Sequence, residues 1–130
     1  ALGLEALSRG AERAVLVDNS AEAIGCIKKN VSSAHMESRA AVKNASAVNF
    51  AKECNDSFDI IFLDPPYSGG LYRAALEAVS ENGLLKSGGV VVCEWDSRIG
   101  KPEISQRFNE VKEKKYGRVC ITVLETAAQD

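Results

Sequence analysis

The residues best suited to chemistry are the four consecutive residues Asp64, Pro65, Pro66 and Tyr67. Two adjacent prolines fix φ and remove two backbone donors, so this backbone can only accept hydrogen bonds. The aspartate adds carboxylate acceptors, which suits holding an NH₂ group, and the tyrosine ring offers a flat face for stacking a base. The tetrapeptide therefore either recognises a nucleobase amine or is only a turn that ends a strand.

A second candidate is Asp18, at the end of a strand predicted over 13–18. An acidic residue at this position can accept hydrogen bonds from the ribose hydroxyls of a nucleoside. The simpler interpretation is that Asp18 belongs to a helix cap together with Asn19 and Ser20. Both candidates follow strands, and ligands of open α/β sheets bind beyond the carboxyl ends of the strands.

The elements that would position these residues alternate between strand and helix. Strands are predicted over 13–18, 39–42, 58–63 and 90–94, with a turn over 86–89. Helices are predicted over 1–9, after Asn19, around 47–54 and over 71–82. This alternation is typical of an α/β fold with a mainly parallel sheet. Strands over 111–115 and 119–124 are joined by so short a loop that they must form an antiparallel C-terminal hairpin.

Two of these helices have clear sequence signals. Asn19 is predicted to cap the helix that follows it, with Glu22 in the capping-box position. The apolar stripe of that helix consists of Ile24, Ile27 and Val31. In the helix over 71–82, the residues expected to face inward are Leu71, Ala74, Ala75, Ala78 and Val79.

The beginning of the sequence departs from this pattern, because residues 1–9 are already typical of a helix. A parallel α/β domain normally begins with a strand and a tight glycine turn into its first helix. We therefore expect residues 1–130 to form one domain that lacks its first strand and most of the glycine-rich loop.

Composition excludes several classes of function. The 130 residues include 16 Lys+Arg and 18 Asp+Glu, so bulk positive charge cannot drive nucleic-acid binding. No apolar run reaches the roughly 18 residues of a membrane span. The single histidine, His35, and the absence of a C-x-x-C pair argue against a metal site. We expect a cytoplasmic protein with no metal, no membrane association, and reduced structural cysteines at Cys26, Cys54, Cys93 and Cys120.

Charge is uneven along the chain. Residues 98–118 contain seven basic and three acidic residues, a local excess of four positive charges. This segment could hold RNA phosphates. An ordinary solvated surface explains it equally well.

In combination, these segments resemble the RsmD-type methyltransferases, which modify guanine N2 in small-subunit ribosomal RNA with S-adenosylmethionine. The resemblance is carried by residues 1–11, Val15–Asp18, Phe58–Tyr67 and Lys114–Gly117, and it covers essentially the whole chain. The Asp-Pro-Pro-Tyr block alone is found in many amino-group methyltransferases.

The resemblance implies a Rossmann-like class I S-adenosylmethionine-dependent methyltransferase, with ribosomal RNA or the assembling small ribosomal subunit as partner. The target base would be held by Asp64, Pro65, Pro66 and Tyr67. Adenine would be read by either Asn44-Ala45 or Ser46-Ala47. The residues expected to bind the cofactor are Ala1, Leu2, Gly3, Asp18, Asn19, Ser46, Ala47 and Asp64. The oligomeric state stays open.

Other functions compete with this interpretation. The same chemistry could act on adenine or cytosine amines of DNA, whereas glutamine methylation is disfavoured because those enzymes usually have Asn in place of Asp64. An NAD-dependent oxidoreductase would use Asp18 equally well, but it leaves the Asp64–Tyr67 block without a role. A non-catalytic interaction domain of the same fold is the third alternative.

Overall fold

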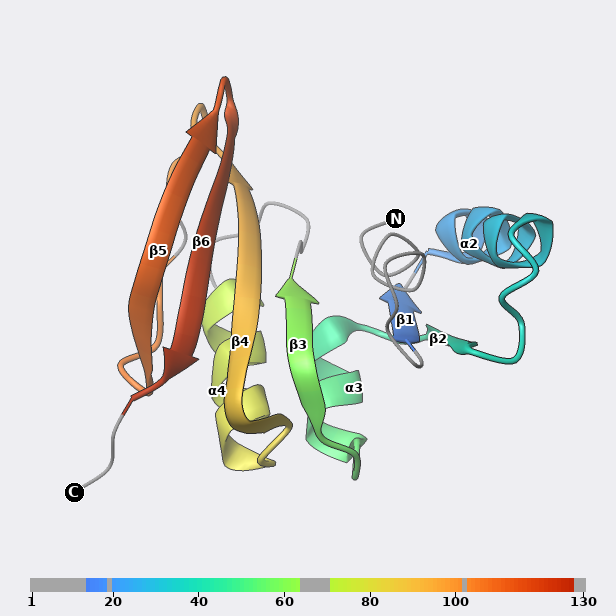
Figure 1. Ribbon diagram of the computed structural model, residues 1–130, viewed down its shortest axis with the longest axis horizontal. Coiled ribbons are helices and arrows are strands. Elements are labelled where there is room, and N and C mark those ends of the chain that lie inside the picture. The colour runs from blue at the N-terminus through green and yellow to red at the C-terminus, as the bar shows by residue number, and fades with distance from the viewer. Residues whose placement is uncertain (1–13, 19, 64–70, 102, 128–130) are drawn as a thin grey trace. The chain divides into compact units, whose positions relative to one another are not determined.

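The computed structural model describes residues 14–18, 20–63, 71–101 and 103–127. The chain divides into two compact units, residues 1–50 and 51–130, which are described one at a time. Each unit contains strands and helices (Figure 1). The α/β organisation expected from the sequence is confirmed, whereas the single domain stays a prediction.

The first unit contains two parallel strands joined by a helix. β1 (Ala14–Asp18) pairs with β2 (Ala40–Asn44) in continuous register, so that their carboxyl ends are level. The connecting helix α2 (Ala21–Ser33) buries Ile24 and Val31, two members of the predicted apolar stripe. These two residues form the buried part of the unit within the described residues.

Two boundaries in this unit differ from the prediction. The N-cap of α2 is Ser20, whose Oγ accepts a hydrogen bond of 3.3 Å from the backbone N–H of Ala23. The prediction that Asn19 caps the helix with Glu22 as its partner is therefore wrong, because Ser20 supplies the capping oxygen. β2 likewise begins one residue later than the predicted strand over 39–42 and extends two residues beyond it.

The second unit is built on a four-stranded sheet with the strand order β3-β4-β6-β5. Its strands are β3 (Phe58–Leu63), β4 (Leu85–Asp96), β5 (Phe108–Tyr116) and β6 (Val119–Thr126). β3 and β4 are parallel, whereas β6 runs antiparallel to both β4 and β5. The predicted C-terminal hairpin is confirmed.

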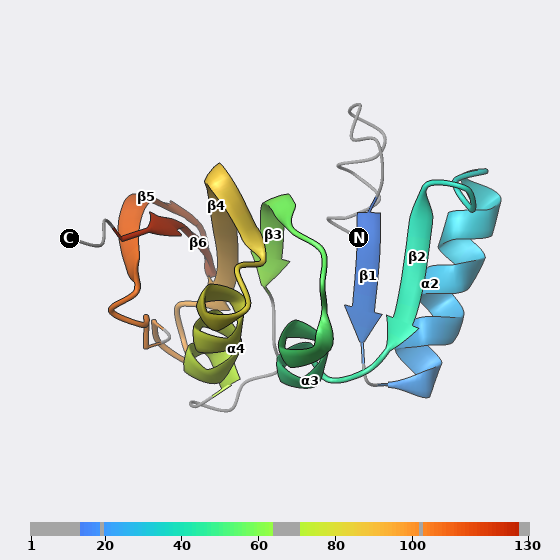
Figure 2. The same cartoon turned by 90° about the horizontal axis from the view of Figure 1, so that it is seen from below.

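Helix α4 (Leu71–Glu81) connects β3 to β4 and lies on one face of the sheet, as Figures 1 and 2 show. Three of its residues expected to face inward are buried, but the sequence analysis missed Leu76, which is fully buried. The buried residues of the sheet are Leu63, Val91, Cys93, Phe108, Cys120, Thr122 and Leu124. The shorter helix α3 (Ala47–Glu53) ends where Asn82 Nδ2 donates to the carbonyl oxygens of Ala51 and Lys52.

The turn predicted over 86–89 lies inside β4. Between the pair Phe58–Leu85 and the pair Ile60–Val90, the register advances by five residues along β4 and by two along β3. β4 therefore accommodates three additional residues in an irregularity of the bulge type. The prediction of a turn before a strand over 90–94 is wrong, because the glycines bend a strand that continues through them.

Within the described residues, no helix is long and apolar enough to cross a membrane. The same residues contain no group of three His, Cys, Asp or Glu side chains placed to hold a metal ion. All four cysteines are free. Cys93 and Cys120 are core residues as predicted, but Cys26 is exposed on α2 and does not have a core role.

Candidate functional site

The candidate base-binding block, Asp64–Tyr67, lies outside the described residues, but both of its flanks are described. β3 ends at Leu63, which is 7% exposed and pairs with the fully buried Cys93 of β4. Helix α4 begins at Leu71. The block therefore starts directly from the carboxyl end of a strand that is anchored in the core, where ligands of α/β sheets bind.

The thiol of Cys93, beside this flank, is a core group and not a nucleophile. Burial raises the pKa of Cys93 to about 12, so the thiol stays protonated at neutral pH. Thiolate chemistry is thereby excluded for Cys93. The carboxylate of Asp64 is the candidate acid–base group of the block that follows this flank.

In the first unit, candidate cofactor residues lie at the carboxyl ends of β1 and β2. Asp18 is the last residue of β1 and pairs with Asn44, the last residue of β2. Ser46 precedes α3, and its Oγ accepts a hydrogen bond of 3.1 Å from the backbone N–H of Asn49, while Ala47 is the first helical residue. The side chain of Asp18 lies outside the described parts of the chain, as do the candidates Ala1, Leu2, Gly3, Asn19 and Asp64.

A polar chain across the second sheet holds Trp95, near the carboxyl end of β4. The Trp95 Nε1 donates to Thr122 Oγ1 at 3.0 Å, and Thr122 Oγ1 donates to Glu113 Oε1 at 3.2 Å. Lys101 Nζ lies 2.9 Å from Glu113 Oε1, and its hydrogen bond lowers the pKa of that carboxyl. The partner of Trp95 lies 27 residues away along the chain, so no local sequence pattern indicates this contact.

The last residue of β4 forms a tight charged turn. Asp96 Oδ1 accepts a hydrogen bond of 2.8 Å from the backbone N–H of Arg98, and Arg98 Nη2 lies 3.1 Å from Asp96 Oδ2. These hydrogen bonds from Arg98 lower the pKa of Asp96. The turn keeps Arg98 at the same end of the sheet as the carboxyl end of β3, because β3 and β4 are parallel.

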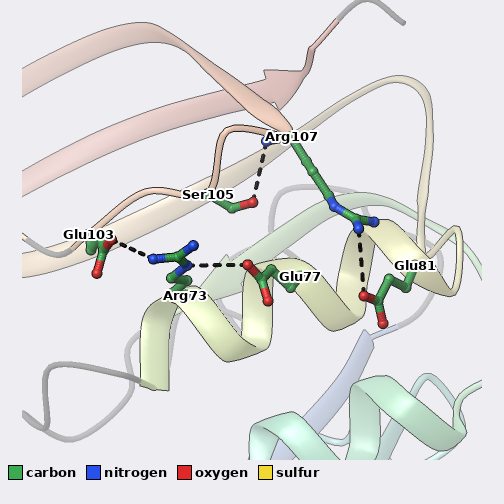
Figure 3. A network of polar contacts seen from close by, with 6 residues as sticks. All are labelled: Arg73, Glu77, Glu81, Glu103, Ser105 and Arg107. Atoms are coloured by element: carbon green, nitrogen blue, oxygen red, sulfur yellow. Dashed lines mark hydrogen bonds and ion pairs between the residues drawn. The ribbon is translucent and has the colours of Figure 1, made fainter.

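Exposed ion pairs connect α4 to the segment before β5 (Figure 3). Arg73 Nη1 lies 2.7 Å from Glu103 Oε1, and Arg73 Nε donates to Glu77 Oε1 at 3.2 Å. Near the other end of the helix, Arg107 Nη2 lies 3.6 Å from Glu81 Oε1. Each exposed pair contributes little energy by itself. Together, the pairs Arg73–Glu103 and Arg107–Glu81 hold the segment before β5 along α4.

Solved structures with the same arrangement of strands and helices define the class of protein. YhhF from Escherichia coli matches with a TM-score of 0.86 and 29% identity, covering 99% of this chain and 72% of that one. The methyltransferase PaMTH1 from Podospora anserina, solved with SAH bound, matches with a TM-score of 0.70 and 15% identity, covering 93% and 64%. The chain therefore has the Rossmann-like class I methyltransferase fold that was expected.

The chain belongs to the family described as Conserved hypothetical protein 95, which matches residues 1–125. It is 31% identical over 125 residues to YlbH from Bacillus subtilis, covering 94% of this chain and 68% of YlbH. It is 30% identical over 129 residues to Ribosomal RNA small subunit methyltransferase D from Escherichia coli, covering 99% and 65%. The resemblance to RsmD-type proteins is confirmed, and the chain spans about two thirds of the length of these relatives.

Proposed function

We propose that this chain transfers a methyl group from S-adenosylmethionine to the exocyclic N2 amine of a guanine in 16S ribosomal RNA. The observation that supports this most strongly is the Asp64–Tyr67 block, which follows the core-anchored end of β3 at Leu63. A relative named Ribosomal RNA small subunit methyltransferase D supports the substrate. Free ribosomal RNA or the assembling small subunit would be the partner, and both place the protein in the cytoplasm.

The carboxyl ends of β1 and β2 fit the nucleoside of this cofactor. Asp18 would accept hydrogen bonds from the ribose hydroxyls, and the neighbouring strand end supplies the amide of Asn44 and the hydroxyl of Ser46. This set of donors and acceptors suits hydroxyls and ring nitrogens. Ala1–Gly3 would be the end of the glycine-rich loop, with Asn19 and Ala47 completing the set. When bound, S-adenosylmethionine supplies a methyl group that its sulfonium sulfur already activates.

The block beginning at Asp64 would orient the amine. A guanine N2 is a poor nucleophile because its lone pair is delocalised into the ring. The Asp64 carboxylate and the Pro65 carbonyl would each accept one N–H of the amine, which turns the lone pair toward the methyl group. Positioning of this kind contributes several kcal/mol, and up to about 7–11 kcal/mol in ideal cases.

The same block would complete proton removal and base recognition. Asp64 or a water molecule would take the proton that leaves the amine after transfer. Pro66 keeps the corner rigid and free of a competing backbone donor. Tyr67 would stack against the base, which must be unpaired or flipped out for its edge to be reached.

Substitution of Asp64 tests this function. Asp64→Ala should lower methyl transfer by about 100-fold or more, in line with the removal of one preorganised catalytic group, and should leave affinity for S-adenosylhomocysteine nearly unchanged. The transfer is measured as radioactive methyl incorporation into small subunits from a strain that lacks its own enzyme, with the modified nucleotide mapped. Calorimetry measures the affinity. Asp18→Ala is the matched control and should weaken cofactor affinity. Unaltered turnover in Asp64→Ala would contradict the assignment.

The competing functions have distinct outcomes in the same assays. Transfer to adenine or cytosine of DNA, with ribosomal RNA inert, would support a DNA amino-methyltransferase. Calorimetric binding of NAD and not of S-adenosylhomocysteine would support an oxidoreductase. Cofactor binding without transfer to either nucleic acid would support an interaction domain.

A further inference from the structure

Strand β5 separates its charged side chains between the two faces of the sheet. Glu113 pairs with the buried Thr122 of β6, whereas the adjacent residues Lys112 and Lys114 face the opposite side. The register shifts at Val111, which is an extra residue in β5. This bulge reverses the alternation, so that the acidic residue before it and the lysine after it lie on opposite faces.

The acidic side of β5 is neutralised within the protein. Lys101 Nζ lies 2.5 Å from Glu110 Oε1 and 2.9 Å from Glu113 Oε1. Hydrogen bonds to these two carboxylates raise the pKa of Lys101. Thr122 donates a further hydrogen bond to Glu113. Both acidic side chains on this face are therefore paired within the protein.

The basic side of β5 has the opposite character. A shallow open groove there is lined by Lys112, Lys114, Tyr116, Ile121 and Val123. No acidic side chain of the described residues forms an ion pair with either lysine, and the adjacent Lys114 lowers the pKa of Lys112 through hydrogen bonding and charge repulsion. The ring of Tyr116 is exposed, since 58% of that residue is accessible. We call these five residues the basic groove.

The register places the end of the basic groove at the end of the sheet where β3 and β4 have their carboxyl ends. Val119 of β6 pairs with Asp96, the last residue of β4, and also with Tyr116 of β5. The hairpin turn therefore lies at the carboxyl end of β4, which is also the carboxyl end of the parallel strand β3. Figure 1 shows the β5–β6 hairpin extending past the arrowhead of β3.

We propose that the basic groove binds the RNA strand that flanks the target nucleotide. This inference rests on the proposed function. The Cα atoms of Lys112 and Lys114 lie two residues apart on one face, about 7 Å along the strand, and each long side chain can reach a different phosphate of one strand. They hold two phosphates, and Tyr116 stacks on a base, a combination typical of single-strand binding. An acidic protein partner would use the lysines but would have no base for the ring.

Three other basic residues of the segment 98–118 have a different role. Arg98, Lys101 and Arg107 are each in an ion pair with an acidic side chain of the second unit. The local excess of positive charge seen in the sequence is therefore concentrated on the lysines of the basic groove and on residues near the hairpin turn.

Fluorescence anisotropy with a labelled single-stranded RNA of about 20 nucleotides tests the proposal on the 130-residue chain. Lys112→Gln/Lys114→Gln should weaken binding by about tenfold at moderate salt. It should also reduce the slope of log K against log salt by about 1.4, the value for two single-strand phosphate contacts. Tyr116→Ala should weaken binding by about fivefold or more, and Tyr116→Phe should not.

The control is Lys28→Gln/Lys29→Gln, which removes the same charge from exposed positions of α2. This control should keep the wild-type affinity and salt slope. The proposal is overturned if both double variants lose affinity equally, if the wild type binds no RNA, or if a polyglutamate peptide competes as well as RNA. Binding of S-adenosylhomocysteine, measured on every variant, separates a failure of the basic groove from a failure of the proposed function.

Discussion

The two strand–helix–strand regions of the chain, β1-α2-β2 and β3-α4-β4, have the same connectivity and different packing. Each joins two parallel strands through one helix. Helix α2 has 13 residues and buries only Ile24 and Val31. Helix α4 has 11 residues, and the buried ones among its described side chains are Ala75, Leu76, Ala78 and Val79.

The same connectivity is therefore compatible with different degrees of side-chain burial. In both regions, backbone N–H and C=O groups are hydrogen-bonded within a parallel strand pair and within a helix whose C-terminal end is capped. Only α4 combines small alanines with a large fully buried side chain, Leu76, which is the pattern of a closely packed helix. The tighter packing is found in the region that carries Asp64–Tyr67, and under the proposed function it would give the base-binding block a rigid support.

Removal of Leu76 should give the largest effect. Leu76→Ala is expected to lower the free energy of unfolding by about 3–5 kcal/mol, because the residue is fully buried and leaves a cavity. Ile24→Ala is expected to cost nearer 2 kcal/mol, because the residue is 7% exposed and the strands beside α2 are only half-buried. Urea unfolding followed by circular dichroism measures both. Equal losses would show that the two regions are packed alike.

A methyl group at Gly89 should have the next largest effect. It would lie 2.7 Å from the carbonyl oxygen of Asp59 and 2.9 Å from that of Lys86, so that backbone must move. Gly89→Ala should therefore cost about 1–3 kcal/mol. The matched control in the first region is Gly25→Ala on α2, where nothing lies within 4 Å, and it should stabilise the chain by about 0.5–1 kcal/mol. Thermal unfolding measures both variants. The prediction is wrong if Gly89→Ala and Gly25→Ala change the free energy of unfolding in the same direction.

Much of this fold could be predicted from local sequence. The strand over 58–63 has the predicted bounds, because its short apolar run is rich in the β-branched and aromatic residues that favour strands. The irregularity over 86–89 could not be predicted, because a glycine pair looks the same in a turn and in a bulged strand. Sequence alone does not distinguish Asn19 from Ser20 as the N-cap of α2, since both residue types are good caps.

The candidate site is predicted from local chemistry, and its residues stay a prediction. Asp64–Tyr67 was identified from residue type and order, and the structure adds the buried end of β3 that precedes it. The hydrogen bond between Trp95 and Thr122 depends on strand pairing across 27 residues, which no local pattern encodes. The basic groove depends on the bulge at Val111, because an uninterrupted alternation would place Lys112 on the face of the acidic residue before it.

The C-terminal end of α4 is closed by a glycine. Gly83 has φ of +61°, and its N–H donates to Ser80 O at 3.3 Å. The N–H of Leu84 donates to Val79 O at 3.0 Å. These two bonds are the Schellman pattern, in which the left-handed residue is usually glycine.

The C-terminal end of α2 has the same two bonds without the glycine. His35 N–H donates to Ser32 O and Met36 N–H to Val31 O, both at 3.0 Å. His35 has φ of +58°, a conformation that disfavours residues with a Cβ. The helix stop is therefore set by its hydrogen bonds, and in α2 it carries a steric cost that α4 avoids.

Substitutions of the left-handed residue at the two helix ends should change the free energy of unfolding in opposite directions and by about the same amount. His35→Gly should stabilise the chain by about 1 kcal/mol, since it relieves the Cβ clash and keeps both hydrogen bonds. Gly83→Ala should destabilise it by about 1 kcal/mol, because nothing lies within 4 Å of the added methyl and only the backbone is strained. Thermal unfolding measures the shifts. Loss of stability in His35→Gly would mean that the imidazole makes a contact that stabilises the chain by more than the backbone strain destabilises it. The end of α2 would then depend on a side-chain contact, whereas the end of α4 depends on its backbone alone.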